Sequence, residues 1–419
     1  MFNPYFFAMA LLAAALPART LYLNRLNLRH MRSGCPVELE GLYTPEEQGK
    51  ALGFQAGKNK WRAATSIVNL CAALALLLLG AYGWLAALAA RAPGGLVAQA
   101  AAMFTALYLW DWLLGLPSGY YLQFGLFQKY GFNRSTKKLF VFDQLKGLPL
   151  GWLVDVWEPV AAAWLFLLLG NWFWPVLWAL SCVFTLIGTY LYPVIIQPLF
   201  NKYTPLPEGE LRSKALSLAQ QTGVPLKNIY IEDSSKRSSM GNAFFAGLGK
   251  SRRCVLYDTL LEKCTDDEIL GVLAHEIGHY RQKRLRLLYY VSDFLKQGLA
   301  YFALSLLIGN DAVARALGGT GASFLLGFAA LNLLWRPLID WLQPLFVSIG
   351  RKMEYDADHH AAACGLVPAN VSALKKLYTT GLGNYNPHPL WVKWNDPHPT
   401  LAERVKFTQG LATGSETVS

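Results

Sequence analysis

The sequence predicts a mainly α-helical, polytopic membrane protein that carries a small α+β domain on one side of the membrane. Three observations lead to this fold class. Hydrophobic residues make up 53% of the 419 residues and charged residues only 16%, which is apolar for a soluble protein. Several apolar stretches reach the roughly 20 residues that a helix needs to cross a bilayer. The basic residues gather in alternate loops between these stretches, as they do in membrane proteins.

We predict seven membrane-spanning helices from the apolar stretches. They lie near Phe2–Leu21, Ser66–Ala90, Leu96–Leu116, Gly151–Leu169, Trp172–Leu199, Leu287–Gly309 and Ala322–Ile349. The first stretch is short because Pro17 and Arg19 interrupt it, and it has some features of a secretory signal. No basic region precedes its apolar run, however, since Asn3 and Pro4 lead directly into it. We therefore retain it as a membrane helix.

The charge of the loops predicts the orientation in the membrane. The segment Arg19–Arg62 and the loop at 129–146 are rich in lysine and arginine, whereas the alternate loops offer little beyond Arg91 and Arg315. Basic loops stay in the cytoplasm, so we expect the N-terminus outside, and residues 201–284 and the C-terminus on the cytoplasmic side. The membrane would be a bacterial inner membrane or an endoplasmic reticulum membrane.

The net charge of +11 is explained by this topology and by attraction to anionic lipid. The sequence contains no recognisable nucleic-acid-binding module. The lipid bilayer is therefore an expected partner, and nucleic acid is not. The six cysteines are scattered without paired spacing, so we expect reduced structural thiols and no metal ligands among them.

This topology divides the chain into four regions. They are transmembrane helices 1–5 with basic cytoplasmic loops at 1–200, a cytoplasmic insert at 201–284, transmembrane helices 6–7 at 285–350, and a C-terminal cytoplasmic segment at 351–419. Within the insert, Leu211–Gln221 has the character of a helix, while Asn228–Glu232 and Cys254–Tyr257 have the apolar, β-branched character of strands. The segment 238–247 between them can supply a third strand. An edge strand beside a reactive site would pair with an extended peptide, although a purely structural sheet fits the same pattern.

The insert ends in the motif His-Glu-Ile-Gly-His, in a chain with only seven histidines. On a helix His275 and His279 share a face, so both imidazoles can bind one metal ion with Glu276 beside it. Zinc held in this way retains a position for water, which the metal acidifies and the glutamate can deprotonate. Thr265 and Glu268 have the spacing of a capping box, which predicts where the helix begins. A helix that carries two histidines by chance is the alternative.

A third metal ligand is expected after the last span. Glu354 and Asp358 lie one helical turn apart, on a single face. Glu354 can complete the metal site, and Asp358 can then accept a hydrogen bond from the outer nitrogen of a metal-bound histidine and fix its tautomer. We interpret Asp356 as a surface residue, and His359 and His360 as bystanders. Taken alone, an acidic run of this kind is an ordinary helix cap.

These motifs stand in an order that resembles the type I CAAX prenyl protease family, whose members are integral-membrane zinc endopeptidases with seven spans. The resemblance covers nearly the whole chain, which makes it more specific than the histidine motif alone. The matching residues are Pro198–Gly209, Ser234–Ser239, Asn242–Phe245, His275–His279, Glu354 with Asp358, and His398–Arg404. One departure is Thr400, where the family often has a second proline.

The resemblance implies one Zn²⁺ ion per chain, bound by His275, His279 and Glu354, with Glu276 as the general base. Family members enclose a water-filled chamber within their membrane helices, and the zinc site faces this chamber. Ionisable residues at membrane depth are costly unless they pair or face water, and this chain has several that would suit such a chamber. They are Asp111, Asp155, Glu158, Asp293, Lys296, Arg336 and Asp340. The last two are four residues apart, and we expect them to pair within one helix.

The resemblance also implies roles in binding and turnover of a peptide substrate. Asn242, Ala243 and Phe244 would lie in the substrate-binding strand. His398 and Arg404 would lie near the scissile bond, where a hydrogen-bond donor and a cation can stabilise the oxyanion. Without the resemblance, the first of these two would be interpreted as a loop histidine and the second as a surface charge.

The reaction that the resemblance implies is endoproteolysis, which releases the C-terminal tripeptide from a peptide that carries a prenylated cysteine. A lipid-modified substrate explains why a hydrolase would be embedded in a membrane. Three other interpretations stay open: a quality-control zinc protease of broader specificity, an intramembrane protease with its motif inside a span, and a zinc-binding scaffold or transporter without hydrolytic activity. The histidine motif precedes the sixth predicted span, which disfavours an intramembrane protease. The presence of Glu276 disfavours a scaffold or transporter without hydrolytic activity.

Overall fold

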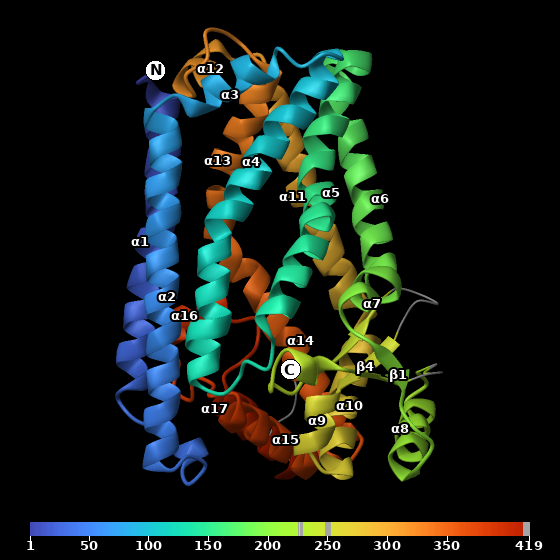
Figure 1. Ribbon diagram of the computed structural model, residues 1–419. Helices are drawn as coiled ribbons and strands as arrows, with labels where there is room; N and C mark the ends of the chain where they lie inside the picture. The colour runs from blue at the N-terminus through green and yellow to red at the C-terminus, as the bar shows by residue number, and fades with distance from the viewer. Residues whose placement is uncertain (225, 227–228, 248–252, 414–419) are drawn as a thin grey trace.

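The computed structural model describes residues 1–419 except 225, 227–228, 248–252 and 414–419. Long helices run side by side for most of the height of the molecule, and a small sheet with shorter helices lies at one end (Figure 1). The long helices and their connecting turns are α1 (Pro4–Met31), α2 (Pro45–Leu78), α3 (Ala81–Ala89), α4 (Gly95–Tyr120), α5 (Lys137–Leu169), α6 (Phe173–Leu191), α7 (Gln197–Phe200), α11 (Lys283–Leu307), α12 (Asp311–Ala316), α13 (Phe324–Trp341) and α14 (Gln343–Ala363). The shorter helices are α8 (Glu210–Gln221), α9 (Asp258–Lys263), α10 (Asp266–Arg281), α15 (Val367–Thr380), α16 (Pro389–Asn395) and α17 (Leu401–Thr413).

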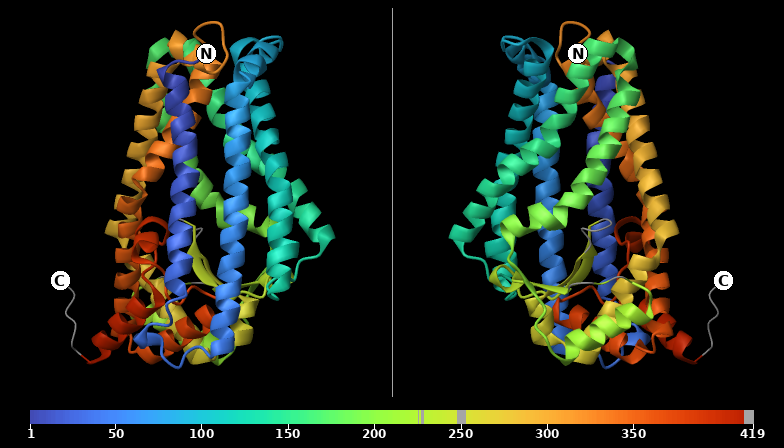
Figure 2. Two further views of the ribbon diagram at one scale, coloured as in Figure 1. Left: turned by 90° about the vertical axis from the view of Figure 1, so that its left-hand side faces the viewer. Right: turned by 90° about the vertical axis from the view of Figure 1, so that its right-hand side faces the viewer.

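The mainly helical, membrane-type architecture matches the predicted fold class. Four helical stretches of the described residues are long and apolar enough to cross a membrane, and the bent pair of α13 and α14 would add a fifth. One of these stretches, Lys137–Phe200, contains both α5 and α6, which fold back on each other at Gly170 (Figure 2). α11 is not in this set, because charged residues such as Asp293 and Lys296 lower its hydropathy. The number of seven spans therefore stays a prediction.

The first two helices are longer than the hydropathy predicts. α1 runs to Met31 rather than Leu21, and α2 begins at Pro45 rather than Ser66. Much of the expected basic loop is therefore helical. Tertiary packing is the reason, because Asn24 and Asn27 in the polar second half of α1 are buried and contact the C-terminal segment.

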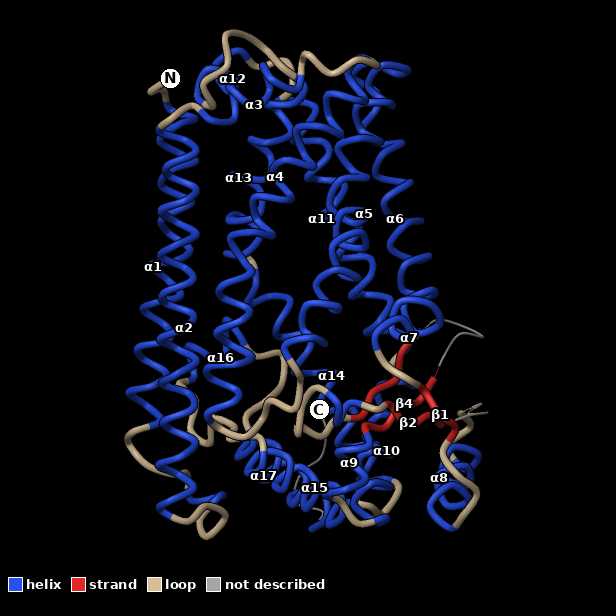
Figure 3. The backbone as a smooth tube through the Cα atoms, in the orientation of Figure 1, coloured by secondary structure: helices blue, strands red, loops and turns tan. Residues whose placement is uncertain are grey.

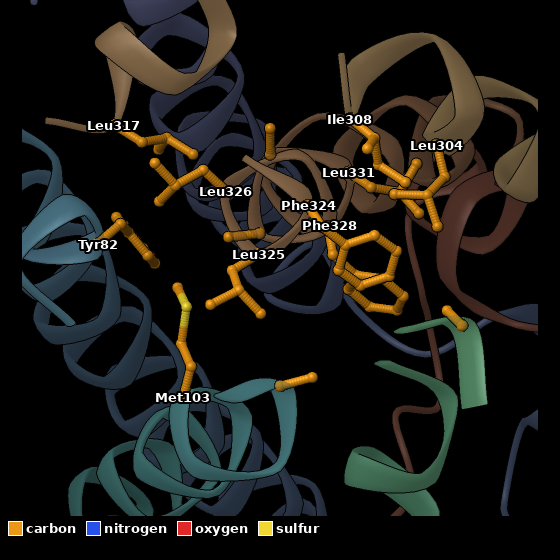
Figure 4. Close-up of a cluster of buried hydrophobic side chains, with 14 of the residues drawn as sticks. Tyr82, Met103, Leu304, Ile308, Leu317, Phe324, Leu325, Leu326, Phe328 and Leu331 are labelled. Atoms are coloured by element: carbon orange, nitrogen blue, oxygen red, sulfur yellow. The ribbon is translucent and has the colours of Figure 1, made fainter. Parts of the chain in front are cut away.

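A large apolar core joins the helices at the end opposite the sheet. Side chains such as Met103, Phe324 and Phe328 meet there from α4 and α13, together with residues of α3 and α11 (Figure 4). α3 approaches the turn after α12 so closely that a Cβ at Gly83 would overlap the backbone of Gly318. Gly318 has a left-handed φ of 86°, which favours glycine. Close packing therefore holds this end together.

The sheet has four strands in the order β1-β2-β4-β3, in which β2 and β4 are parallel and the other pairs antiparallel (Figure 3). They are β1 (Tyr203–Pro205), β2 (Ile229–Glu232), β3 (Ala243–Ala246) and β4 (Arg253–Tyr257). The three predicted strands and the predicted helix at α8 are confirmed, although residue 228 lies outside the described residues. β1 was not predicted, because it is short and ends in proline. Among the described residues β3 pairs only with β4, so β3 is an edge strand of the sheet. Helix α10 lies against β3.

A polar network ties the sheet to the long helices. Arg237, in the loop between β2 and β3, donates to both carboxylate oxygens of Asp143 on α5, at 2.8 and 2.6 Å. The same guanidinium donates to the side chain of Asn201 at 2.5 Å. Asn201 in turn donates to Glu232 at the end of β2, also at 2.5 Å. Because β2 pairs with β4 and β4 pairs with β3, this network also fixes the position of β3 relative to α5.

The last predicted span is not one straight helix. α13 and α14 are bent by 52° where they meet at Leu342. Pro344, in the first turn of α14, has no N–H to continue the hydrogen-bond ladder of α13. Asp340, near the bend, pairs with Arg19 of α1 and not with Arg336, so the predicted pair within one helix was wrong. Asp340 thus has its partner on another helix, and not four residues away on α13. The bend itself directs α14 toward α10 (Figure 1).

Candidate metal centre

Helix α10 begins where the sequence predicts, and its first turn is anchored. The backbone N–H of Thr265 donates to the Glu268 carboxylate at 2.8 Å, and the backbone N–H of Glu268 donates to Thr265 Oγ1 at 3.3 Å. The same carboxylate accepts hydrogen bonds from Ser372 and Lys376 of α15, at 2.7 and 2.6 Å. The predicted capping box is confirmed, and it also joins α10 to its neighbour.

α10 packs against α14 and α15 through two glycines that lie two helical turns apart. A Cβ at Gly278 would lie 2.7 Å from the Cα of Ala357 on α14, and a Cβ at Gly271 would lie 2.5 Å from the backbone N of Asn370 on α15. Both distances are too short for any side chain larger than hydrogen. The glycine inside the His-Glu-Ile-Gly-His motif therefore sets the separation between the helix with the histidines and the helix with the carboxylates.

Three candidate ligands converge between these two helices. The Nε2 atoms of His275 and His279 lie 3.4 and 3.1 Å from the two carboxylate oxygens of Glu354. All three ligand atoms lie within 4.8 Å of one another, and the searched part of the chain contains no second group of this kind. Ligand atoms of a tetrahedral zinc site are separated by roughly 3.4 Å, given bonds near 2.0–2.1 Å. Oε2 of Glu354 is buried without a hydrogen-bond partner, so the residues fit a metal ion.

Asp358 lies behind the histidine pair, as predicted, and has further partners. Its carboxylate is 2.8 Å from Nδ1 of His275. Arg404 donates to both of its oxygens, at 2.7 and 2.8 Å, and Asn370 donates to one of them at 3.3 Å. A carboxylate at Nδ1 holds the proton on that nitrogen and leaves Nε2 free to face Glu354. The orientation of His275 is therefore fixed from behind.

Glu276 follows His275 on the same helix and is half-buried. Burial raises the pKa of the Glu276 carboxyl, although the nearby histidines act in the opposite direction. A carboxylate with a raised pKa is a better proton acceptor, which suits a general base.

His398 and Arg404 reach the centre from the C-terminal segment and occupy different environments. Nε2 of His398 lies 3.4 Å from Glu354, and 54% of its side chain is exposed. A hydrogen bond with Asp396 raises the pKa of His398. The Arg404 side chain is only 8% exposed, and its guanidinium contacts Glu354 at 3.3 Å as well as Asp358. His398 thus lies at the open side of the centre and Arg404 at its buried side.

The predicted substrate-binding residues lie at the start of the edge strand. The carbonyl of Asn242 accepts a hydrogen bond from the backbone N–H of Tyr257 at 3.0 Å, which extends the pairing of β3 with β4 by one residue. Ala243 is buried, and the ring of Phe244 packs against that of Tyr257 with centroids 6.0 Å apart. Since α10 lies against β3, the strand is next to the helix that carries the histidine motif.

The residues that we set aside lie outside the ligand group. His359 is exposed, and Asp356 and His360 are half-buried on α14. All six cysteines are free. Two residues of the site were not predicted from the sequence: Gly278, which contacts α14, and Asn370, which donates to Asp358. For the glycine a signal existed, because two glycines spaced by two turns inside one helix indicate close helix packing.

Over most of its length the chain is similar to known proteins. Residues 24–202 match the family model described as CAAX prenyl protease N-terminal, five membrane helices, and residues 205–412 match Peptidase family M48. A CAAX prenyl protease 1 homolog of Oryza sativa is 30% identical over 391 residues, which cover 91% of each chain. CAAX prenyl protease 1 of Saccharomyces cerevisiae is 35% identical over 330 residues, which cover 74% of this chain and 72% of the yeast protein.

The fold has a close counterpart among solved structures. The crystal structure of Ste24p from S. mikatae superposes with a TM-score of 0.90 at 30% sequence identity, and the match covers 97% of this chain and 100% of that one. The sequence match, the fold match and the histidine–carboxylate group agree on a membrane metalloendopeptidase. The chain belongs to the type I CAAX prenyl protease family, within peptidase family M48.

Proposed function

We propose that this protein is a zinc-dependent membrane endopeptidase that removes the C-terminal tripeptide from prenylated CAAX-type substrates. The observation that carries the proposal is the convergence of His275, His279 and Glu354 beside Glu276, in a chain whose relatives are named CAAX prenyl proteases. The substrate class comes from those names, since no single residue of the described chain identifies a prenyl group.

The three converging residues would hold one Zn²⁺ ion. Two imidazoles and a carboxylate are a common ligand set for catalytic zinc, whereas magnesium and calcium prefer oxygen ligands throughout. When bound, zinc supplies a Lewis acid that acidifies a water molecule and polarises a carbonyl group. Asp358 supports this set by orienting His275, and Arg404 supports it by compensating the charges of Asp358 and Glu354. The burial of Arg404 favours this positioning role over direct contact with the oxyanion.

Two residues act on the substrate in this proposal. Glu276 accepts the proton of the attacking water and passes it to the leaving amine. His398 donates a hydrogen bond to the scissile carbonyl oxygen as negative charge develops there, because its side chain is both exposed and close to Glu354. The edge strand from Asn242 through Phe244 pairs with the main chain of the substrate and presents the scissile bond to these groups.

The membrane topology is part of the same proposal. Seven spans, an external N-terminus and a site on the cytoplasmic side follow from the hydropathy and the basic loops. Residues 1–200 and 285–350 form the membrane part in this scheme, and residues 201–284 and 351–419 the cytoplasmic part. A lipid-modified substrate would then reach the centre from the cytoplasmic leaflet.

A peptidase assay on the purified protein tests the proposal. Matched peptides that end in a CAAX sequence, one farnesylated and one unmodified, are incubated with the untreated protein, with protein treated with a chelator, and with chelated protein given back Zn²⁺. We expect the farnesylated peptide to lose its last three residues much faster, chelation to stop cleavage, and Zn²⁺ to restore it. Equal rates on the two peptides would contradict prenyl specificity and favour a quality-control protease.

The variant Glu276→Gln separates catalysis from metal binding. The amide keeps the size of the side chain but cannot accept the proton of water, so turnover should fall by about 10²–10⁴-fold. The zinc content should stay at one ion per chain, because Glu276 is not a ligand. Retained turnover in this variant would refute the assigned base.

A further inference from the structure

One face of α1 follows the segment that leads to His398. Asn24, Asn27 and His30 are spaced by three residues, so they share a side of the helix. Each of them contacts a residue between positions 384 and 391. Two of the three are almost fully buried, with exposed fractions of 6% for Asn24 and 5% for Asn27. Buried amide oxygens need hydrogen-bond donors, and the segment supplies donors to the Oδ1 atoms of both asparagines.

The asparagines act as acceptors for this segment. Oδ1 of Asn27 accepts hydrogen bonds from the side chain of Asn384 at 3.1 Å and from the backbone N–H of His388 at 2.9 Å. Oδ1 of Asn24 accepts a hydrogen bond from Nε1 of Trp391 at 3.1 Å. The contacts therefore hold both the loop before α16 and the first turn of α16 itself.

Residues at either end of this face extend the contact. Arg19 lies over the ring of Trp394, 4.5 Å from its centroid, near the end of α16. His30 lies 3.2 Å from the carbonyl oxygen of Asn386, whose side chain donates to the backbone of Gly34 at 2.8 Å. From Arg19 to His30 the partners run from Trp394 back toward the start of the segment, so α1 and the segment are antiparallel along the whole contact.

The same segment is fixed from a second side by α14. Arg351 donates to the carbonyl oxygens of Val392 and Asp396, at 3.3 and 3.2 Å. A Cβ at Gly350 would lie 2.8 Å from Pro397, so the chain passes directly over α14 at that point. The side chain of Asp396 then accepts a hydrogen bond from the backbone N–H of His398 at 3.1 Å. α1 and α14 thus hold the residues immediately before His398.

His398 depends on this support more than a buried residue would. More than half of its side chain is exposed, so few packing contacts of its own fix its position. We propose that the polar face of α1, formed by Arg19, Asn24, Asn27 and His30, positions His398 for catalysis. This assigns α1 a positioning role in the reaction in addition to its role as a membrane helix. The inference rests on the role of His398 in the proposed function.

The sharpest test changes Asn27 in two ways. Asn27→Leu removes the acceptor at nearly constant size, whereas Asn27→Asp retains an acceptor for both donors. With the farnesylated CAAX peptide, we expect Asn27→Leu to lower kcat by roughly 10–100-fold, since a displacement of about 1 Å can have that effect. The KM and the zinc content should change little, and Asn27→Asp should restore most of kcat. Equal kcat values in wild type and Asn27→Leu would overturn the proposal.

A double mutant identifies the residue through which α1 acts. In a His398→Ala background Asn27→Leu should lower kcat by less than about twofold further, because coupled residues are not additive. Full additivity would mean that α1 acts elsewhere and would overturn the proposal. If His398→Ala alone left kcat unchanged, the assigned role of His398 would fall, and the role of α1 with it.

Two more variants separate positioning from general loss of stability. Asn3→Ala removes the hydrogen bond that the Asn3 side chain donates to the carbonyl oxygen of Ala312, at the other end of α1, and should leave kcat unchanged. Trp391→Phe keeps the ring but removes the N–H that contacts Asn24, and should lower kcat even if Asn27→Leu fails to fold. A fall in kcat with Asn3→Ala as large as that with Trp391→Phe would overturn the positioning role.

Discussion

His275 and His398 both come within 3.4 Å of a Glu354 oxygen, but their surroundings differ. His275 is 7% exposed, and its second nitrogen is held by Asp358, which in turn is held by Arg404. His398 has 54% of its side chain exposed, and contacts with its backbone and with the preceding residues position it. The ring of His275 is fixed by a buried hydrogen-bond network. His398 is positioned by contacts of its backbone and of the residues before it.

In the proposed function this difference separates two tasks, metal binding by His275 and contact with the substrate by His398. Metal binding needs ligands that stay in place with and without the ion, and a buried charge network gives that rigidity. Contact with a substrate needs an accessible donor, and accessibility removes the packing that would otherwise hold it. Changes on the buried side should therefore affect stability and metal affinity, and changes on the open side should affect turnover.

The largest effect is expected for Arg404→Met. The apolar side chain leaves the carboxylates of Asp358 and Glu354 buried without their cation, which should cost about 3–5 kcal/mol of folding free energy. The thermal stability of the purified protein in detergent measures this loss. Arg315→Met is the matched control, because the exposed pair of Arg315 with Asp311 should contribute less than about 1 kcal/mol. Similar Tm values for both variants would contradict the buried network.

The next effect concerns the open side. His398→Ala should lower kcat on the CAAX peptide by about 10²–10³-fold, because it removes the donor that we propose for the developing oxyanion. Its Tm and zinc content should match those of the wild type, since the side chain is mostly exposed. His359→Ala, which changes an exposed histidine on α14, serves as the control and should leave kcat intact. Loss of zinc from the His398 variant would remove the distinction between the two sides.

A smaller effect is expected for Asp358→Asn. The amide cannot hold His275 in one tautomer as the carboxylate does, so zinc affinity should fall by about 10–100-fold. Competition with a metal-binding dye measures this change directly. The control is Asp356→Asn on the same helix, outside the ligand group, which should leave the affinity as it is. An unchanged zinc affinity in the Asp358 variant would mean that Asp358 does not orient His275 for metal binding.

The smallest effect is expected at the start of α10. Burial acts to raise the pKa of Glu268, but hydrogen bonds from Lys376, Ser372 and Thr265 outweigh it and hold the pKa below its usual value. A lowered folded-state pKa stabilises the protein above the unfolded-state value of about 4.3, and the benefit disappears as the pH falls through the folded-state pKa. Glu268→Gln should therefore cost about 1 kcal/mol at pH 7, measured as a lower Tm.

The pH dependence provides the check on that prediction. The difference in Tm between wild type and Glu268→Gln should begin to narrow as the pH falls below about 4.3 and should close below the lower folded-state pKa of Glu268, where this carboxyl is also neutral. A difference that stays constant with pH would mean that the charge of Glu268 does not matter. The anchor of α10 would then be steric.

The sequence was most informative where one helix carries the whole signal. The spacing of His275 and His279, and the capping box from Thr265 to Glu268, depend only on local geometry, so both could be predicted. Glu354 could be proposed as the third ligand from its spacing with Asp358 and from the family resemblance. Hydropathy gave no sign of the 52° bend that directs α14 toward α10, because a hydropathy average does not register that Pro344 interrupts the hydrogen-bond ladder.

The parts that sequence could not predict depend on contacts between distant residues. The hydropathy pattern ends the first span at its polar residues, but Asn24 and Asn27 continue the helix because the segment after residue 384 buries them. Asp340 found its partner in Arg19, more than 300 positions away, instead of in its helical neighbour. Gly278 was recognised as part of a motif, yet its function appears only when α14 is placed against it.

The contact between Arg404 and His275, which spans 129 residues of sequence, has a consequence for biosynthesis. A ribosome delivers the histidine motif long before it delivers Arg404. During that interval Asp358 has no cation beside it, and His398 does not yet exist. Until the C-terminal segment has been made, the nascent polypeptide therefore lacks two residues of the proposed site.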